Sequence, residues 1–225
     1  MMSFRRLIPL FFLTLLPWLP SQAQATGEWV NAGVSFNLPK RFSARVTTSG
    51  RFLNTGIGLV KYLVQFEGGY KINKHLDVAL IYRSAWRLED DGRYHYRDKF
   101  MAEVSSDASA GRFSFTNRLR YQRRTKTYRR DDWDAIPLQH MRDKISVEYD
   151  IPKCKLTPVV YGEMFFPLYP FRTRTVDEVR LGADFKYKIS KKHSVKAGIM
   201  MQNGVAGIPV NAVWFRMGYT YKIKL

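Results

Sequence analysis

The feature that most constrains the fold of this chain is an alternation of apolar and polar residues with a period of two, which begins at Trp29 and runs to the last residue. The final segment, VWFRMGYTYKIKL, shows the alternation most clearly. Val213, Phe215 and Met217 begin its apolar series, and Trp214 and Arg216 lie between them. A period of two is typical of β-strands with one apolar and one polar face. No stretch shows an apolar period of about 3.6 residues, so the pattern predicts an all-β chain.

Turn signals divide the alternating region into about eleven strand-like segments. They are 28–36, 41–52, 60–70, 76–87, 94–106, 112–124, 140–151, 156–166, 176–189, 194–203 and 211–225. Short connectors (37–40, 71–75, 107–111, 152–155 and 190–193) alternate with longer ones (around 53–59, 88–93, 125–139, 167–175 and 203–210). Short periplasmic turns that alternate with longer extracellular loops are typical of outer-membrane barrels. The sequence therefore predicts a transmembrane, antiparallel, up-and-down β-barrel.

The number of strands is left open between about 10 and 12. Bacterial single-chain barrels have even strand numbers. If 37–40 is a periplasmic turn, the segment 28–36 begins on the extracellular side. Either this segment is not a barrel strand, or one further strand has no clear signal.

Residues 1–25 have the three regions of a secretory signal peptide. Arg5 and Arg6 form a positive region, residues 7–19 are apolar, and residues 23–25 read Ala-Gln-Ala. The alternative is a membrane anchor helix, but prolines interrupt the apolar run, which is also short for a span of about 20 residues. We therefore predict cleavage after Ala25 and a single barrel domain over 26–225 in the bacterial outer membrane.

The composition limits the kinds of partner that this barrel can bind. The formal net charge is +18, which favours anionic partners. The basic residues are spread over the strands rather than gathered on one face, which argues against nucleic acid. The chain has one cysteine, Cys154, and so no internal disulfide, and its four histidines are scattered. No metal motif is present, and no cofactor is predicted.

The polar positions of the strands are rich in charge. If the apolar positions face lipid, the polar positions face the lumen. The predicted lumen-lining charged residues are Arg45, Glu67, Arg83, Arg97, Glu103, Arg118, Arg120, Arg142, Glu148, Glu163, Arg180, Asp184 and Arg216. Two interpretations stay open: paired charges that hold a narrow barrel together, and a narrow pore that favours anions.

A smaller set of charged residues is predicted to lie at the outer rim of the barrel. Asp98, Arg123 and Asp143 lie at apolar positions, and the segment bounds place them near the long loops. We expect them at the rim, because an arginine in mid-bilayer would cost about 2–4 kcal/mol. The loop 125–139 and its flanks carry a predicted basic outer rim, formed by Arg123, Arg124, Lys126, Arg129 and Arg130. Such a rim could bind the phosphates of lipopolysaccharide, and a solvated loop is the alternative.

Three functional classes fit these features. The first is a narrow channel or structural barrel with an Arg- and Lys-rich lumen, which prefers anions if it conducts. The second is an outer-membrane lipid-modifying enzyme, and the third is a soluble periplasmic ligand-binding barrel. A serine hydrolase needs a Ser, a His and an acid in contact. His95 and His140 fall near the outer ends, but no G-x-S-x-G motif is present. We predict no catalytic residue and no enzymatic activity.

Three stretches carry a resemblance to a known family: GEWVNAGVSFNLPKRFS near the start of the alternating region, YKINKHLDVALIYR at 70–83 and FTNRLRYQRR at 115–124. They resemble an uncharacterised family of bacterial outer-membrane β-barrels of the Bacteroidota type, labelled a domain of unknown function. The resemblance implies the location and fold, and it supplies no catalytic residue. One departure is the last residue, Leu225, where barrel-assembly signals commonly end in Phe. We predict a monomer that contacts outer-membrane lipid and lipopolysaccharide and is inserted by the barrel-assembly machinery.

Overall fold

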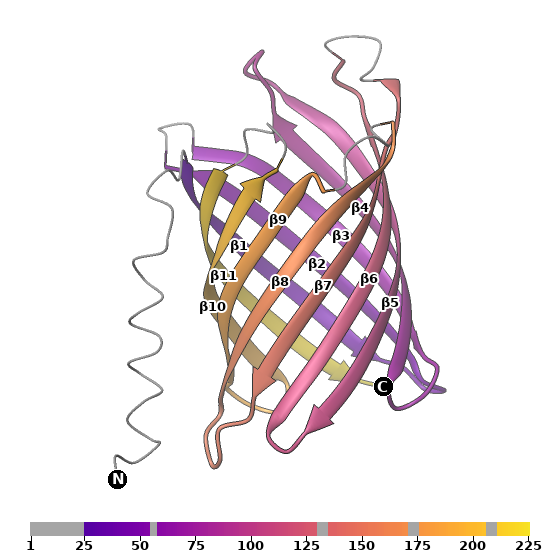
Figure 1. Cartoon of the computed structure of the whole chain (residues 1–225), viewed down its shortest axis with the longest axis vertical. Coiled ribbons are helices and arrows are strands. Elements are labelled where there is room, and N and C mark those ends of the chain that lie inside the picture. Colours follow the sequence, from indigo (N-terminus) through magenta and orange to yellow (C-terminus); the bar gives the residue numbers. More distant parts are fainter. Residues whose placement is uncertain (1–24, 55–57, 130–134, 171–175, 206–210) are drawn as a thin grey trace.

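A computed structural model describes residues 25–54, 58–129, 135–170, 176–205 and 211–225. The described residues form eleven strands that close into one barrel (Figure 1). The strands are β1 (Ala25–Asn37), β2 (Phe42–Leu53), β3 (Gly58–Lys71), β4 (Leu76–Leu88), β5 (Tyr94–Ala110), β6 (Phe113–Lys126), β7 (Leu138–Tyr149), β8 (Leu156–Tyr169), β9 (Glu178–Lys188), β10 (His193–Gly204) and β11 (Asn211–Lys224). The predicted signal peptide lies outside the described residues except for Ala25, which begins β1.

The barrel closes through a parallel pair of strands. Each strand from β1 to β10 pairs antiparallel with the next, and β1 pairs parallel with β11, from Ala25 opposite Ala212 to Asn37 opposite Lys224. An odd number of alternating strands always brings two parallel strands together at closure. The predicted all-antiparallel pairing is therefore wrong at this one seam. Closure is favoured because a bilayer offers no water to an unpaired strand edge.

The seam register gives a direct test. In a Cys154→Ser background, the double variant Val30→Cys with Met217→Cys is expected to form a disulfide, because these residues are opposite each other in the seam. The control pairs Val30→Cys with Tyr221→Cys, whose partner is Val34 and which therefore lies about 13 Å further along the strand. Intact mass measured with and without reductant reads out the bond. A bond in neither variant, or in the control alone, would contradict this closure.

The predicted alternation in connector length holds only in part. The longest connectors, 127–137 and 170–177, lie at the same end of the barrel (Figure 1), but the connector 54–57 at that end is shorter than the connector 150–155 at the other end. The predicted connector 107–111 is wrong in its extent, because β5 continues to Ala110. The period of two also continues, so that these residues still pair with β6. Only Gly111 and Arg112 separate the strands, and Gly111 has a φ of 60°, which glycine adopts at low cost in a tight turn.

The two faces of the barrel have opposite chemistry. Large apolar side chains point outward and are exposed, among them Phe66, Leu80, Phe100, Leu181 and Met217. Several charged side chains of the alternate positions, among them Arg142, Glu163 and Asp184, are buried, although the barrel is a single sheet. This arrangement is that of a transmembrane barrel, since a small soluble barrel places its apolar face inside. Within the described ranges, no helix is long and apolar enough to cross a membrane.

The interior also contains apolar side chains. A cluster of Tyr161, Met200, Ala212 and Trp214 lies next to the β1–β11 seam, and Trp29 packs against it. These residues occupy the same strand faces as the buried charges. The lumen is therefore lined by aromatic as well as charged groups, and these side chains narrow it.

Candidate functional site: the charged lumen

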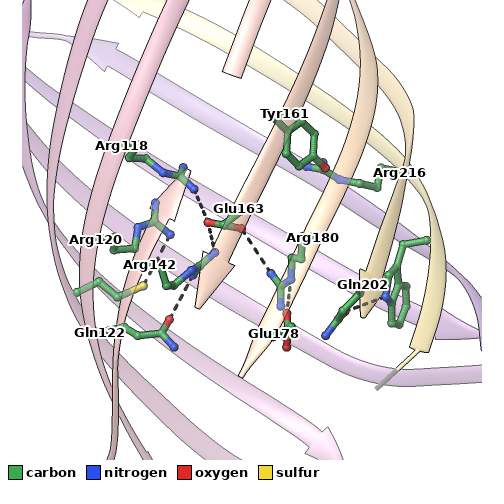
Figure 2. Close-up of polar contacts among 12 residues, drawn as sticks. Arg118, Arg120, Gln122, Arg142, Tyr161, Glu163, Glu178, Arg180, Gln202 and Arg216 are labelled. Carbon is green, nitrogen blue, oxygen red and sulfur yellow. Dashed lines mark hydrogen bonds and ion pairs between the residues drawn. The ribbon is translucent and has the colours of Figure 1, made fainter. Parts of the chain in front are cut away.

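The centre of one lumen wall is a buried carboxylate that several arginines share. Glu163 on β8 is only 5% exposed. Its Oε1 atom accepts hydrogen bonds from Arg118 Nη2 on β6 at 3.0 Å and from Arg142 Nη2 on β7 at 2.7 Å, and Arg180 Nη1 on β9 lies 3.9 Å from Oε2 (Figure 2). We call these residues the paired cluster: Glu163, Arg118, Arg142 and Arg180. Because Arg118 reaches across β7, its side chain must lie on the concave face of the sheet.

Neighbouring groups hold the paired cluster in place. Arg142 Nη1 donates to Gln122 at 3.2 Å, and Arg180 Nε donates to Glu178. The Phe165 ring lies between the two guanidinium groups, each 4.4 Å from the ring centroid. Cation–π contacts of this kind stabilise a desolvated guanidinium. This wall therefore binds its charges tightly to one another.

A second set of buried ion pairs follows the wall towards the seam. Asp184 on β9 is 4% exposed and lies 3.3 Å from Arg216 Nη1 on β11 and 3.5 Å from Lys196 Nζ on β10. Arg216 also donates to the Tyr161 hydroxyl on β8. Contacts between strands that are not neighbours again place these side chains inside the barrel. Here too each buried charge has an opposite charge beside it.

The facing wall has a different character. Arg51 on β2 is directly opposite Lys61 on β3, and Arg83 on β4 is directly opposite Lys99 on β5. We call these four residues the cationic arc. In the parts of the chain that the structure describes, none of them forms an ion pair with a carboxylate. Arg83 donates to the neutral Gln65, and the Arg51 guanidinium lies 3.6 Å from the centroid of a Trp29 ring.

The arc is therefore electrostatically unbalanced. Lys61 is repelled by Arg51 and Arg83, and Lys99 is repelled by Lys61 and Arg83. Like charges that are directly opposite in a sheet are destabilising. An anion that enters the lumen would relieve this repulsion, whereas a cation would increase it.

The structure places every predicted lumen-lining residue on the interior face. All of them except Arg83 form an ion pair, including Arg45 with Glu67, Arg97 with Glu89, Arg120 with Glu103 and Glu148 with Lys186. That they contact a solute stays a prediction. Of the cationic arc, the predicted list includes only Arg83. Arg51 and Lys99 lie at polar positions that the alternation also assigns to the lumen, whereas Lys61 and the interior aromatic residues were missed. The alternation itself carried the signal for Lys61, which lies between the apolar Val60 and Tyr62.

The residues of the predicted basic outer rim point to both faces of the barrel wall. Arg124 and Lys126 lie on the interior face of β6, Arg123 beside Arg124 points outward, and Arg129 is exposed in the following loop. Arg130 lies outside the described residues. These side chains do not share one face because neighbouring residues of a strand point to opposite faces. Binding of lipopolysaccharide by any of these residues remains a prediction.

One charge of the predicted rim is not at the rim. Asp143 lies in the middle of β7, opposite Leu119 and Met164 on the outer face. The prediction for this residue is wrong because β7 begins at Leu138, nearer to the loop than the segment 140–151 suggested. Asp143 is thus a carboxyl group within the lipid-facing surface.

The two histidines near the long loops each bind an aspartate. His140 Nε2 lies 2.8 Å from Asp177 Oδ2, and His95 Nε2 lies 2.6 Å from Asp91 Oδ2. The pKa of Asp91 is lowered, chiefly by a hydrogen bond from the Arg93 backbone N–H and then by His95. The other ring nitrogen of His140 has no hydrogen-bond partner among the described residues. No serine therefore contacts it, as a hydrolase triad requires.

Metal binding has no candidate site in the described ranges, where no group of three or more His, Cys, Asp or Glu side chains is placed to hold an ion. The features that are present belong to another class: a closed barrel with an apolar outside and a charged inside. That is a transmembrane β-barrel of the outer-membrane type.

Comparison with known proteins agrees with this class. The model of the family described as "Protein of unknown function (DUF2490)" matches residues 26–207, and the chain belongs to this family. No curated protein matches the sequence. Among solved structures, a NanC porin in a rhombohedral crystal form has 15% identity and a TM-score of 0.51, over 87% of this chain and 99% of that one.

A second solved structure, an anion-selective porin from Comamonas acidovorans, has 10% identity and a TM-score of 0.38, over 81% of this chain and 52% of that one. The NanC match shows a shared fold. It extends over nearly the whole of that porin.

Proposed function

We propose that this protein is a narrow outer-membrane channel that prefers anions. The observation that carries the proposal is the cationic arc, in which Arg51, Lys61, Arg83 and Lys99 face the lumen without a carboxylate partner. Charged groups that line a constricted pore select the permeating ion by sign. The fold shared with a NanC porin supports the channel class at the level of architecture alone.

The two lumen walls have different roles in this proposal. The paired cluster holds three arginines around one shared carboxylate, with Glu103 beside Arg118 and Glu178 beside Arg180, and it fixes the shape of the lumen. The cationic arc keeps an excess of positive charge, and Arg83 is repelled chiefly by Arg120 and then by Arg180 and Arg118. A constriction lined by one sign of charge, with walls of low dielectric constant, concentrates the opposite ion. Anions therefore pass along the arc, between the arc and the paired cluster.

The test is single-channel recording of the refolded chain in a planar bilayer with a salt gradient. Wild-type protein is expected to conduct, with a reversal potential that indicates a preference for anions over cations. The double variant Lys61→Gln with Lys99→Gln is expected to lower the anion-to-cation permeability ratio at least severalfold, because it removes half of the arc's charge.

The matched control removes the same charge elsewhere. Lys191→Gln with Lys192→Gln changes two lysines in the exposed turn between β9 and β10. Its permeability ratio is expected to stay at the wild-type value. Equal shifts in both double variants would mean that net charge alone sets the ratio. Heat-modifiable gel mobility shows that the sample is folded. If such a sample does not conduct, the lumen is closed and the channel proposal fails.

A further inference from the structure

The outer face of β6 and β7 carries a polar pair where the bilayer requires apolar groups. Asn117 Nδ2 on β6 donates to Asp143 Oδ1 on β7 at 2.7 Å. The cross-strand neighbours of Asp143 are Leu119 and Met164, and its neighbours along β7 on the same face are Met141 and Ile145. Leu119, Ile145 and Met164 are exposed on the outer surface. The surrounding side chains therefore place the carboxyl group within the apolar, lipid-facing surface.

This pair leaves hydrogen-bonding capacity unused. The amide of Asn117 has two N–H donors and a carbonyl acceptor, and a carboxyl group has two oxygens. Only one donor and one oxygen meet in the bond described, and neither residue has another partner in the described part of the chain. Lipid chains offer no hydrogen bonds, so each unsatisfied group costs free energy there.

The surface next to the pair is shaped for close approach. Gly162 on β8 faces outward and is directly opposite Ile145 on one side and Leu181 on the other. It has no side chain of its own between these larger apolar side chains. In a bilayer, small residues allow two backbones to approach closely, and polar side chains then bond across the contact.

We propose that this face, formed by Asn117, Asp143 and Gly162, joins two copies of the chain about a twofold axis along the membrane normal. A twofold contact brings the same patch of each copy together. The free N–H of Asn117 in one copy then meets the free Asp143 oxygen in the other, and the reverse bond forms by symmetry. A second copy fits better than lipid, because only a surface with both a donor and an acceptor completes both groups.

This dimer differs from the monomer that the sequence predicts, and it does not depend on whether the lumen conducts. The first test is cysteine cross-linking in membranes, in a Cys154→Ser background. Ile145→Cys lies beside the polar pair and is 53% exposed, whereas Phe215→Cys lies on β11, away from the pair, and is 52% exposed. Oxidation is expected to convert most of the Ile145→Cys protein to a covalent dimer and little of the Phe215→Cys protein.

The second test uses steric block. Gly162→Leu is expected to convert the dimer to monomer in detergent, measured by light scattering. The barrel itself tolerates the change, because an added Cβ would only reach ordinary contact with Leu181 at 3.6 Å. The matched control is Gly68→Leu on β3, another outward-facing glycine, where an added Cβ meets nothing within 4 Å. This control should remain dimeric.

Several outcomes would overturn the interface. These are a wild-type monomer in membranes and detergent, equal cross-linking at both cysteine positions, or a dimer that Gly68→Leu disrupts and Gly162→Leu does not. Heat-modifiable mobility confirms that each variant is folded before it is scored. Asp143→Leu gives an independent reading, since it keeps the surface apolar and should lower the dimer fraction.

Discussion

Replacing Glu163 with glutamine is expected to lower the free energy of unfolding by about 3–5 kcal/mol. The substitution keeps the size of the side chain and removes its charge. Arg118, Arg142 and Arg180 then remain together without the carboxylate that they share. The cost of leaving buried charges uncompensated is much greater than the net stabilisation that an intact pair supplies. Urea unfolding in phospholipid vesicles, followed by tryptophan fluorescence, measures the change.

The control for this prediction is Glu148→Gln. Glu148 also pairs with a cation inside the barrel, Lys186, but the two side chains are 29% and 43% exposed. A solvated pair of this kind contributes about 0–1 kcal/mol. The two substitutions remove the same charge, so their difference isolates the effect of burial. If both variants lose the same stability, water reaches the paired cluster freely and the proposed rigid wall is wrong.

The same variant also bears on conduction. Glu163→Gln adds net positive charge to the lumen without touching the cationic arc. In a conducting barrel it should raise the anion-to-cation permeability ratio, opposite in sign to the loss of Lys61 and Lys99. Measurements of stability and of ion selectivity on these variants therefore distinguish the roles of the two lumen walls.

The fold was predictable because a bilayer imposes a simple rule on every strand. Outward positions must be apolar, so residues such as Val213, Phe215 and Met217 give both the strand and its orientation. The parallel closure was not predictable in the same way. Pairing of β1 with β11 does not change the alternation of either strand, because the outward positions are apolar whether the neighbouring strand is parallel or antiparallel.

The sequence predicts which face of the strands carries the candidate site, but not the contacts within that site. The alternation with a period of two assigns Arg83, Glu163 and Arg216 to the interior, but it cannot show which charges form ion pairs. The contact of Arg216 with Tyr161 joins β11 to β8 and depends on the curvature of the closed barrel. The position of Asp143 was missed for a related reason. Two residues of error in the start of β7 moved it from the rim into the lipid-facing band.

The second large effect is expected from Gly198→Ala on β10. Gly198 faces the lumen directly opposite Asp184 on β9. A Cβ atom at this position would overlap the Ala183 carbonyl oxygen and the Asp184 carboxylate far inside van der Waals contact. The glycine is thus what allows Asp184 to lie flat against β10 and reach Arg216 and Lys196. We expect a loss of about 3 kcal/mol in the free energy of unfolding, from overpacking and the displaced carboxylate together.

The neighbouring strand supplies the control. Gly218 on β11 also faces the lumen, and its added Cβ would meet only atoms of Lys196, at 3.9 Å or more. Gly218→Ala should therefore change stability by less than about 1 kcal/mol, and it could stabilise by restricting the unfolded chain. Vesicle unfolding of both variants under one set of conditions decides the matter. If Gly198→Ala is as stable as Gly218→Ala, Asp184 does not lie against β10, and its ion pairs with Arg216 and Lys196 are not formed as described.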